Sequence, residues 1–346
     1  MSILNNYVCI VPFTYLEIHR NKVFGCCPSW MPEPYGDTNN IKNIWNDEQA
    51  VKTRESVLDG SYTYCDEKNC FYLSQLLHEN YVSEVFIKKS DFRNIKGPQR
   101  LNLCFDRSCN LSCPSCRKDI IIANNKELEE NQDILIQVSK EFHDTVKTLY
   151  LSGSADPFAS KTFKNLLINY DDKLFPNLTS IHLHTNGLLF DEEMWNKMSK
   201  VHKFISSFEV SIDAGTEDTY KKVRGGNWEK LISNLNFINS IDRMTDKKYS
   251  FVVQDINYKE MLTFYNLIFE LKKNNYPAKV YFNKILNWGT YTDDEYFQKQ
   301  IWNEEHPYFN DYLEELKKIS FKPYVSHDMN DIVEKYKLKP KPNKLI

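Results

Sequence analysis

The sequence lacks the features that mark several classes of protein. No run of about 18 apolar residues occurs, so no membrane span is expected. The N-terminal residues MSILNNYVCIVPF contain no basic stretch leading into a long apolar segment, so no secretory signal is expected either. The chain also lacks the basic excess of most nucleic-acid-binding proteins, since 44 basic side chains stand against 47 acidic ones. A folded cytoplasmic protein with no membrane or nucleic-acid partner is therefore expected.

Cysteine is missing from the last two thirds of the chain and crowded into the first third. All nine cysteines lie between Cys9 and Cys116, and the remaining 230 residues contain none. An odd number of cysteines in a cytoplasmic chain makes a disulfide framework a poor interpretation. Core cysteines would scatter through the fold, so this clustering of thiols favours metal binding.

The N-terminal residues predict a small domain with both strands and helices. Residues 8–18 alternate loosely between apolar and polar side chains, and a polar turn then leads into residues 23–27, which is typical of a hairpin. Residues 43–58 predict a helix that ends at Asp59-Gly60, and a second helix begins at Phe71. Because five cysteines fall here, we expect residues 1–95 to form a small cysteine-rich α+β auxiliary domain.

From residue 96 onward the pattern changes to alternating strands and helices. The predicted strands are residues 100–105, 147–152, 180–184, 208–212, 250–253 and 279–283, and the predicted helices are residues 126–142, 161–170, 192–201, 217–223, 228–238 and 258–273. Each parallel crossover needs a helix, so an α/β fold with a partial (β/α)6 TIM-like barrel is expected over residues 96–290. Ligands of such folds bind at the C-terminal ends of the strands. Residues 291–346 predict helices followed by a Lys/Pro-rich tail.

A cysteine motif follows the first of these strands. Cys109, Cys113 and Cys116 form a C-x3-C-x2-C loop. Three thiolates on one loop can hold three irons of a cubane cluster and leave the fourth iron open to a ligand. The spacing alone equally allows a zinc site completed by a distant Cys or His. The position at the end of a strand that opens a β/α series favours the cluster.

This loop and its position resemble the signature of radical S-adenosylmethionine (SAM) enzymes, and the resemblance spans roughly residues 100–290. It implies that Cys109, Cys113 and Cys116 bind a [4Fe-4S] cluster whose open iron is chelated by SAM. Electron transfer then splits SAM into methionine and a 5′-deoxyadenosyl radical, which abstracts a hydrogen atom from the substrate. The resemblance also implies a reductant such as flavodoxin or ferredoxin. It leaves the substrate open between a peptide, a sugar and a small metabolite.

Later strand ends are similar to the SAM-binding turns of the same family. Residues 153–156 resemble its G-G-E-P turn, with Asp156 in place of the usual Glu, and residues 184–187 resemble its T-N-G turn. Residues 211–214 look like its S-[IL]-D-[GA] segment, and residues 224–226 resemble an R-G-G turn whose guanidinium pairs with the SAM carboxylate. The SAM contacts that the resemblance implies are Gly153, Ser154, Asp156, Ser211, Asp213 and Arg224. Ser115 departs from the family pattern, which often has an aromatic residue there.

The N-terminal cysteines resemble a SPASM/twitch-type auxiliary cluster domain. The shared pattern is a C-x2-P-[WF] start, a hairpin ending in two adjacent cysteines, a helix and a final cysteine pair. In most relatives this module follows the barrel, whereas here it precedes it. The resemblance implies a second [4Fe-4S] cluster on Cys9, Cys26, Cys65 and Cys70. Cys27 is the alternative to Cys26, because adjacent residues of a strand point to opposite faces. A structural zinc ribbon is the alternative to the cluster.

Cys104 belongs to neither cysteine group. It alternates with Leu103 and Phe105, so it is expected to face the barrel lumen. It is interpreted either as a hydrogen-atom donor to a substrate radical or as an inert buried cysteine. The predicted function of the whole chain is that of a radical SAM enzyme. The alternative is a non-catalytic, zinc-stabilised binding module.

Overall fold

The computed structural model describes residues 3–78, 81–151, 155–271 and 278–338, and its contacts divide them between two compact units. Within these ranges, the first unit comprises residues 1–107, 123–155 and 160–182, and the second comprises residues 108–122, 156–159 and 183–346. The loop that carries Cys109 to Cys116 therefore lies in the second unit, and the N-terminal cysteines lie in the first. The domain boundaries predicted at residues 95 and 290 separate an auxiliary domain, a partial barrel and a C-terminal segment, and they stay predictions.

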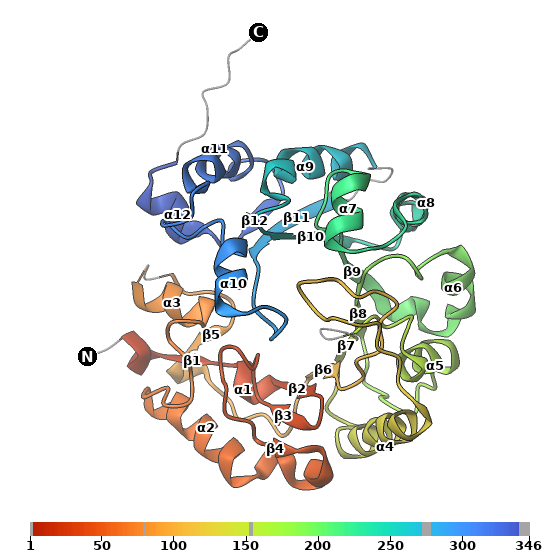
Figure 1. Ribbon diagram of the computed structural model, residues 1–346. Helices are drawn as coiled ribbons and strands as arrows, with labels where there is room; N and C mark the ends of the chain where they lie inside the picture. Colours follow the sequence, from red (N-terminus) through yellow and green to blue (C-terminus); the bar gives the residue numbers. More distant parts are fainter. Residues whose placement is uncertain (1–2, 79–80, 152–154, 272–277, 339–346) are drawn as a thin grey trace. The chain divides into compact units, whose positions relative to one another are not determined.

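The first unit contains most of the N-terminal half of the chain (Figure 1). Its strands are β1 (Tyr7–Cys9), β2 (Tyr15–His19), β3 (Lys22–Phe24), β4 (Gly36–Asp37), β5 (Phe86–Lys88), β6 (Arg100–Cys104) and β7 (Thr148–Leu151). Its helices are η1 (Ile3–Asn6), α1 (Val11–Thr14), η2 (Thr38–Asn46), α2 (Glu48–Asp59), α3 (Phe71–His78), η3 (Lys89–Asp91), α4 (Asn125–Glu141) and α5 (Lys161–Asn169). Strand β8 (Ser180–Thr185) gives its first three residues to this unit and its last three to the second.

Strand β6 is central to the sheet of the first unit. It pairs in parallel with β7 and with β2, while β2 pairs antiparallel with β3, and β3 with β4. Strands β1 and β5 form a separate antiparallel pair. Side-chain alternation explains the position of β6, because Leu101 and Leu103 are fully buried while Asn102 donates a hydrogen bond to Glu17. The predicted hairpin is confirmed as β2 and β3. The sequence did not predict that β2 joins the parallel strands.

Two N-terminal predictions are wrong in part. The strand predicted over residues 8–18 is interrupted by the helical turn α1, which has a proline in its first positions. The helix predicted over residues 43–58 begins only at Glu48, because Asp47 has a non-helical ψ of 152° and its carboxylate caps the N–H of Gln49. Its predicted end is confirmed at Gly60, whose φ of 88° lies in the left-handed region that favours glycine.

The second unit carries the C-terminal elements (Figure 1). Its strands after β8 are β9 (Ile205–Ser211), β10 (Asp246–Val253), β11 (Ala278–Lys284) and β12 (Val325–His327). Its helices are α6 (Glu192–Lys197), η4 (Ser199–Phe204), α7 (Glu217–Val223), α8 (Trp228–Ser240), η5 (Tyr258–Glu260), α9 (Met261–Glu270), α10 (Asp293–Lys299), α11 (Phe309–Ile319) and α12 (Asn330–Lys335).

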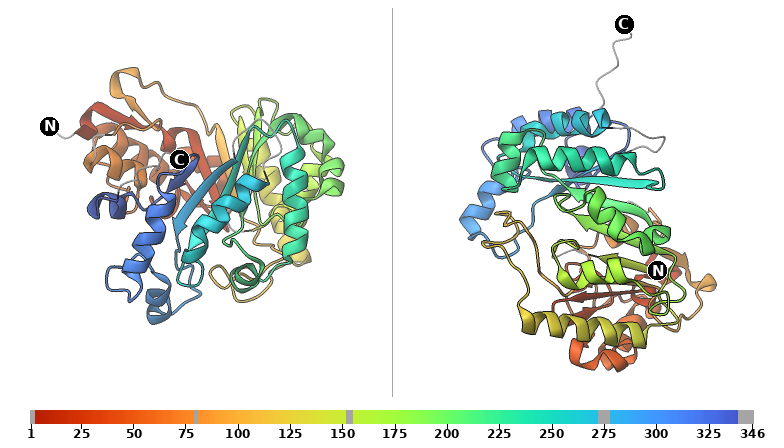
Figure 2. Two further views of the ribbon diagram at one scale, coloured as in Figure 1. Left: turned by 90° about the horizontal axis from the view of Figure 1, so that it is seen from above. Right: turned by 90° about the vertical axis from the view of Figure 1, so that its right-hand side faces the viewer.

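Strands β9 to β12 pair in parallel in the order of the sequence. Alternate residues have different surroundings, since Val210, Phe251 and Phe282 are fully buried. Helix α9 packs on β11 and contacts α11, and Figure 2 shows it running beside that strand. The remaining positions carry polar side chains such as Ser211 and Ser250, which are paired across the two strands. The sheet of this unit therefore has an apolar side and a polar side.

The predicted α/β fold with a mostly parallel sheet is confirmed. The six strands and six helices predicted over residues 96–290 correspond to β6–β11 and α4–α9. The prediction of helices alone after residue 291 is wrong, because β12 pairs with β11. This strand has only three residues, so its alternation is too short to distinguish it from a turn. None of the described helices combines the length and apolarity that crossing a membrane requires.

Candidate functional site

Backbone hydrogen bonds shape the loop of Cys109, Cys113 and Cys116 within the second unit. The N–H of Cys109 donates to the carbonyl of Ile121 at 2.8 Å. The carbonyl of Cys113 accepts hydrogen bonds from the N–H groups of Cys116 at 2.8 Å and Arg117 at 3.0 Å. Cys109 and Cys113 are buried, whereas Cys116 is exposed. The three thiols therefore sit on one tight turn with two of them shielded from water.

Each of the three cysteine sulfurs accepts a hydrogen bond from a different side chain of the same unit. The pairs are Asn186 Nδ2 with Cys109 Sγ at 3.7 Å, Arg224 Nη1 with Cys113 Sγ at 3.7 Å, and Arg117 Nε with Cys116 Sγ at 3.4 Å. Burial raises the pKa values of the Cys109 and Cys113 thiols, and the Arg224 guanidinium acts in the opposite direction on Cys113. N–H donors favour a charged sulfur, so these contacts favour the thiolate forms of the three cysteines.

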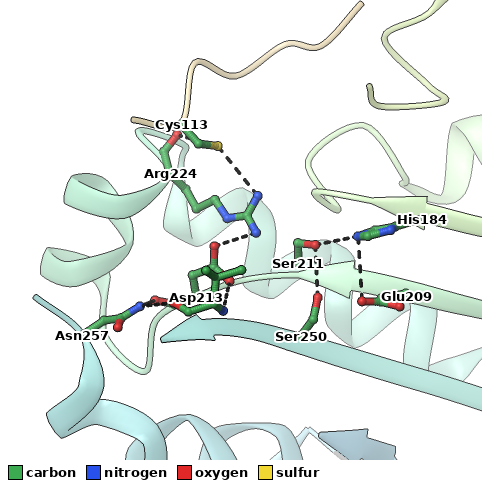
Figure 3. Close-up of polar contacts among 9 residues, drawn as sticks. Cys113, His184, Glu209, Ser211, Asp213, Arg224, Ser250 and Asn257 are labelled. Atoms are coloured by element: carbon green, nitrogen blue, oxygen red, sulfur yellow. Dashed lines mark hydrogen bonds and ion pairs between the residues drawn. The ribbon is translucent and has the colours of Figure 1, made fainter. Parts of the chain in front are cut away.

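Arg224 is fixed from two sides. Its Nη2 atom forms an ion pair with Asp213 Oδ2 at 2.7 Å, and Figure 3 shows the guanidinium between this carboxylate and the Cys113 sulfur. Burial raises the pKa of Asp213, and the charge of Arg224 opposes that rise. The third nitrogen of the guanidinium, Nε, is buried without a hydrogen-bond partner among the described residues. Its N–H group is therefore available to an acceptor on a ligand.

The backbone of Asp213 is strained at the end of β9. Its φ of 60° is in the left-handed region, which non-glycine residues seldom adopt. Three contacts hold it there: the ion pair with Arg224, a 2.7 Å hydrogen bond from the Val252 N–H to Asp213 Oδ1, and a 2.9 Å bond from Asn257 Nδ2 to the Asp213 carbonyl. Strain that several contacts impose at a strand end is characteristic of a functional site.

Asp156 is a buried carboxylate without an ion-pair partner in the described part of the chain. Its Oδ2 atom accepts hydrogen bonds from Thr185 Oγ1 at 2.7 Å and from the Asn186 N–H at 2.9 Å, and its Oδ1 accepts from the Phe158 N–H at 3.0 Å. Burial raises its pKa, while these hydrogen bonds favour the charged form. Asp156 thus joins two of the turns predicted to contact SAM, and a bound cation would compensate its charge.

A polar network on the strands β8, β9 and β10 lies beside Asp213, to its right in Figure 3. Ser211 Oγ lies 2.8 Å from His184 Nε2 and 3.1 Å from Ser250 Oγ. Glu209 forms an ion pair with Lys248 at 2.9 Å and lies 3.9 Å from His184. Burial raises the pKa of Glu209, but the charges of His184 and Lys248 outweigh this effect and lower the pKa to about 2. Ser211, a predicted SAM contact, is therefore one member of a larger hydrogen-bonding surface.

In the first unit, the five N-terminal cysteines are electrostatic neighbours. The pKa of Cys26 is raised first by burial and then by Cys9, Cys70, Cys27 and Cys65. Burial also raises the pKa values of Cys9 and Cys65 to about 12. The predicted set of Cys9, Cys26, Cys65 and Cys70 therefore lies in one region, where Cys26 is buried and the other three are partly buried.

Cys27 has different surroundings from Cys26. Burial raises the pKa of its thiol, and hydrogen bonds from Ser29 and the Trp30 N–H act in the opposite direction. Its carbonyl accepts the N–H groups of Trp30 and Met31, both at 2.9 Å. Cys27 is thus held within its own turn. This difference favours Cys26 as the fourth thiol of the set, which stays a prediction.

Two predicted SAM contacts, Gly153 and Ser154, lie outside the described residues. Cys104 is buried in the first unit, where its Sγ donates to Asn102 Oδ1 at 3.2 Å. The alternation of Cys104 with Leu103, predicted from the sequence, agrees with this contact. Its role as a hydrogen-atom donor stays a prediction.

Sequence reasoning missed Tyr220 and Arg117. Tyr220 is fully buried one helical turn before Arg224, and its hydroxyl has no hydrogen-bond partner among the described residues. Burial raises its pKa, and the charges of Arg224 and Cys113 also act on it. The four-residue spacing of Tyr220 and Arg224 in a predicted helix was the available signal. For Arg117 the signal was its position directly after the last cysteine of the motif.

The chain is similar to one protein family over part of its length and to several solved structures. Residues 104–268 match the model of the Radical SAM superfamily. Similar solved structures include Streptococcus suis SuiB bound to S-adenosylmethionine, with 14% identity, a TM-score of 0.44, and coverage of 84% of this chain and 62% of that chain. Another is anSMEcpe with bound AdoMet, with 18% identity, a TM-score of 0.45, and coverage of 64% of this chain and 56% of that chain. A third is a radical SAM methyltransferase from Sphaerobacter thermophilus, with 12% identity, a TM-score of 0.37, and coverage of 64% of each chain. No curated protein matches the chain.

Over residues 104–268, slightly less than half of its length, the chain is similar to a radical SAM superfamily domain. The superfamily cleaves SAM at an iron–sulfur cluster. The chain spans 62% of the length of the SuiB chain.

Proposed function

We propose that this protein is an enzyme that holds a [4Fe-4S] cluster through Cys109, Cys113 and Cys116 and reductively cleaves SAM there to start hydrogen abstraction from a substrate. The observation that carries the proposal is that all three sulfurs of the loop accept N–H hydrogen bonds within one unit. When bound, the cluster supplies the electron that turns SAM into methionine and a 5′-deoxyadenosyl radical. A reductant such as flavodoxin or ferredoxin would deliver that electron.

The donor set of the loop suits a cubane. A single zinc ion requires its ligands to converge at about 2.0–2.3 Å, whereas each cysteine of a cubane binds an iron of its own. In the ranges that the structure describes, no group of three or more His, Cys, Asp or Glu side chains is arranged to hold one metal ion. Three separated thiols on one turn are compatible with a cubane. The alternative of a zinc-stabilised binding module gains no support.

Two groups of the second unit are suited to hold the methionyl part of SAM. Asp156 offers a buried carboxylate to the ammonium group, and Arg224 offers its unpaired Nε–H to the carboxylate group. Hydrogen bonds from the turn at Thr185 and Asn186 fix the first, and Asp213 fixes the second. Both charged groups are shielded from water, which strengthens their interaction with a bound ligand.

The N-terminal cysteines are proposed to hold a second cluster. Cys9, Cys26, Cys65 and Cys70 supply the four thiolates that saturate a [4Fe-4S] cubane, and all four lie in the first unit, close enough to act on one another electrostatically. Burial keeps these thiols protonated without metal, so binding must release protons. This auxiliary cluster and the SPASM/twitch-like domain that would hold it rest on the cysteine pattern and on this proximity.

Analysis of iron, sulfide and zinc after anaerobic reconstitution tests the proposal. Two cubanes predict about eight irons and eight sulfides per chain. With dithionite, the protein is expected to convert SAM slowly to 5′-deoxyadenosine without added substrate. Stoichiometric zinc, with neither iron nor SAM cleavage, is the result that refutes it.

Replacing Asp156 with asparagine is expected to weaken SAM binding roughly ten- to a hundred-fold, because a charge-assisted hydrogen bond contributes about 1.5–3 kcal/mol. Asp156→Asn removes the charge. It also places an NH2 group next to one of the two backbone N–H groups that now donate to the Asp156 carboxylate. Equilibrium binding of SAM at matched iron content measures the change. Asp218→Asn, on the exposed side of α7, is the control that should bind SAM like the parent. Parent-like affinity in Asp156→Asn would mean that the turn is only structural.

A further inference from the structure

The hydrogen-bond donors around the three cysteine sulfurs differ in charge and in exposure. Asn186 donates a neutral amide, whereas Arg117 and Arg224 donate cationic groups. Arg117 is buried, but the sulfur that it contacts belongs to the exposed Cys116. Arg224, whose side chain is 13% exposed, contacts the sulfur of the buried Cys113. Of the two cations, Arg224 is therefore the one that acts on a buried sulfur.

The contacts of Arg224 fix the position of its guanidinium group. Asp213, whose side chain is 2% exposed, binds Nη2 and leaves Nη1 directed at the Cys113 sulfur. Val252 and Asn257 in turn hold Asp213 through its carboxylate and its carbonyl. A lysine has a single nitrogen and cannot reproduce this bridge between a carboxylate and a sulfur.

Reduction of an iron–sulfur cluster adds negative charge that spreads over its sulfurs. Hydrogen bonds to those sulfurs and nearby positive charge stabilise the reduced form and so raise the reduction potential. The effect grows where water is excluded. We propose that Arg224, positioned by Asp213, sets the reduction potential of the cluster by donating its Nη1–H group to Cys113. This inference rests on the proposed cluster at Cys109, Cys113 and Cys116, and it makes Arg224 a positioning and tuning residue besides its proposed contact with SAM.

The test is an EPR-monitored redox titration of the reconstituted full chain. The signal to follow is the one that changes when SAM is added, because it belongs to the cluster with the open iron. In Arg224→Gln, the ratio of reduced to oxidised cluster at the parent midpoint is expected to fall at least about tenfold, which is 59 mV for one electron. Arg224→Lys keeps the charge and loses the bridge, so a smaller fall is expected.

The matched control is Lys221→Gln, which removes a positive charge from the same helix at an exposed ion pair with Glu217. It should titrate like the parent. Arg224→Gln with full iron, a SAM-responsive signal and a parent-like midpoint overturns the inference. Loss of iron from both Arg224 variants also overturns it, because the role of Arg224 would then be structural. A parent protein without any SAM-responsive signal contradicts the proposed function instead, so the two failures are distinguishable.

Discussion

Replacement of Cys109, Cys113 and Cys116 together by alanine is expected to abolish SAM cleavage and to remove about half of the bound iron. In the proposed site, SAM chelates the open iron of the cluster on this loop, so no cleavage should remain without its three thiolates. The N-terminal thiols lie in the other unit and should keep about four irons. The measurements are 5′-deoxyadenosine formed with dithionite and iron per chain after anaerobic reconstitution.

A control on the same loop separates loss of ligands from loss of folding. Asp119→Ala changes an exposed residue between Cys116 and Ile121 and should retain both iron and SAM cleavage. If the triple alanine variant still cleaves SAM, these cysteines serve another purpose and the proposed site is wrong. If it loses all of its iron, the two cysteine groups depend on each other.

The strands of this protein were predictable where apolar and polar residues alternate, and less so where lysines take part. Strand β10 begins at Asp246, four residues before its predicted start. Lys247 is buried there, with its Nζ donating to the Asn239 carbonyl at 3.2 Å, and Lys248 pairs with Glu209. Asn239 lies eight positions before Lys247, at the end of α8, and Glu209 lies on β9, so the alternation within β10 itself presents both lysines as solvent-exposed. Partners supplied by the fold explain the difference.

The site divides in the same way between local and non-local information. The cysteine loop is a continuous motif, so its spacing and its position after β6 were readable from the sequence. The contact between Arg224 and Cys113 joins residues 111 positions apart, and the sequence led to a contact with SAM alone. Asp156 was predicted as a contact to SAM, yet it also accepts hydrogen bonds from the turn at Thr185 and Asn186. A motif within one continuous segment was predictable from the sequence. The hydrogen bonds between distant segments that position its side chains were not.

The two adjacent cysteines after β3 are expected to behave differently. Cys26→Ala should lose at least about one of the four irons of the auxiliary cluster, whereas Cys27→Ala should keep all four. Cys9, Cys65 and Cys70 all act on the pKa of Cys26, while Cys27 is bound within its own turn by Ser29 and Trp30. Removing one of four thiolates leaves a cubane with an exchangeable iron, which is readily lost. The measurement is iron per chain after reconstitution, with SAM cleavage measured in parallel. Each variant lacks a single sulfur atom, so the two can be compared directly. Loss of iron in Cys27→Ala but not in Cys26→Ala would reverse the assignment. Unchanged iron in both would mean that neither thiol binds a cluster.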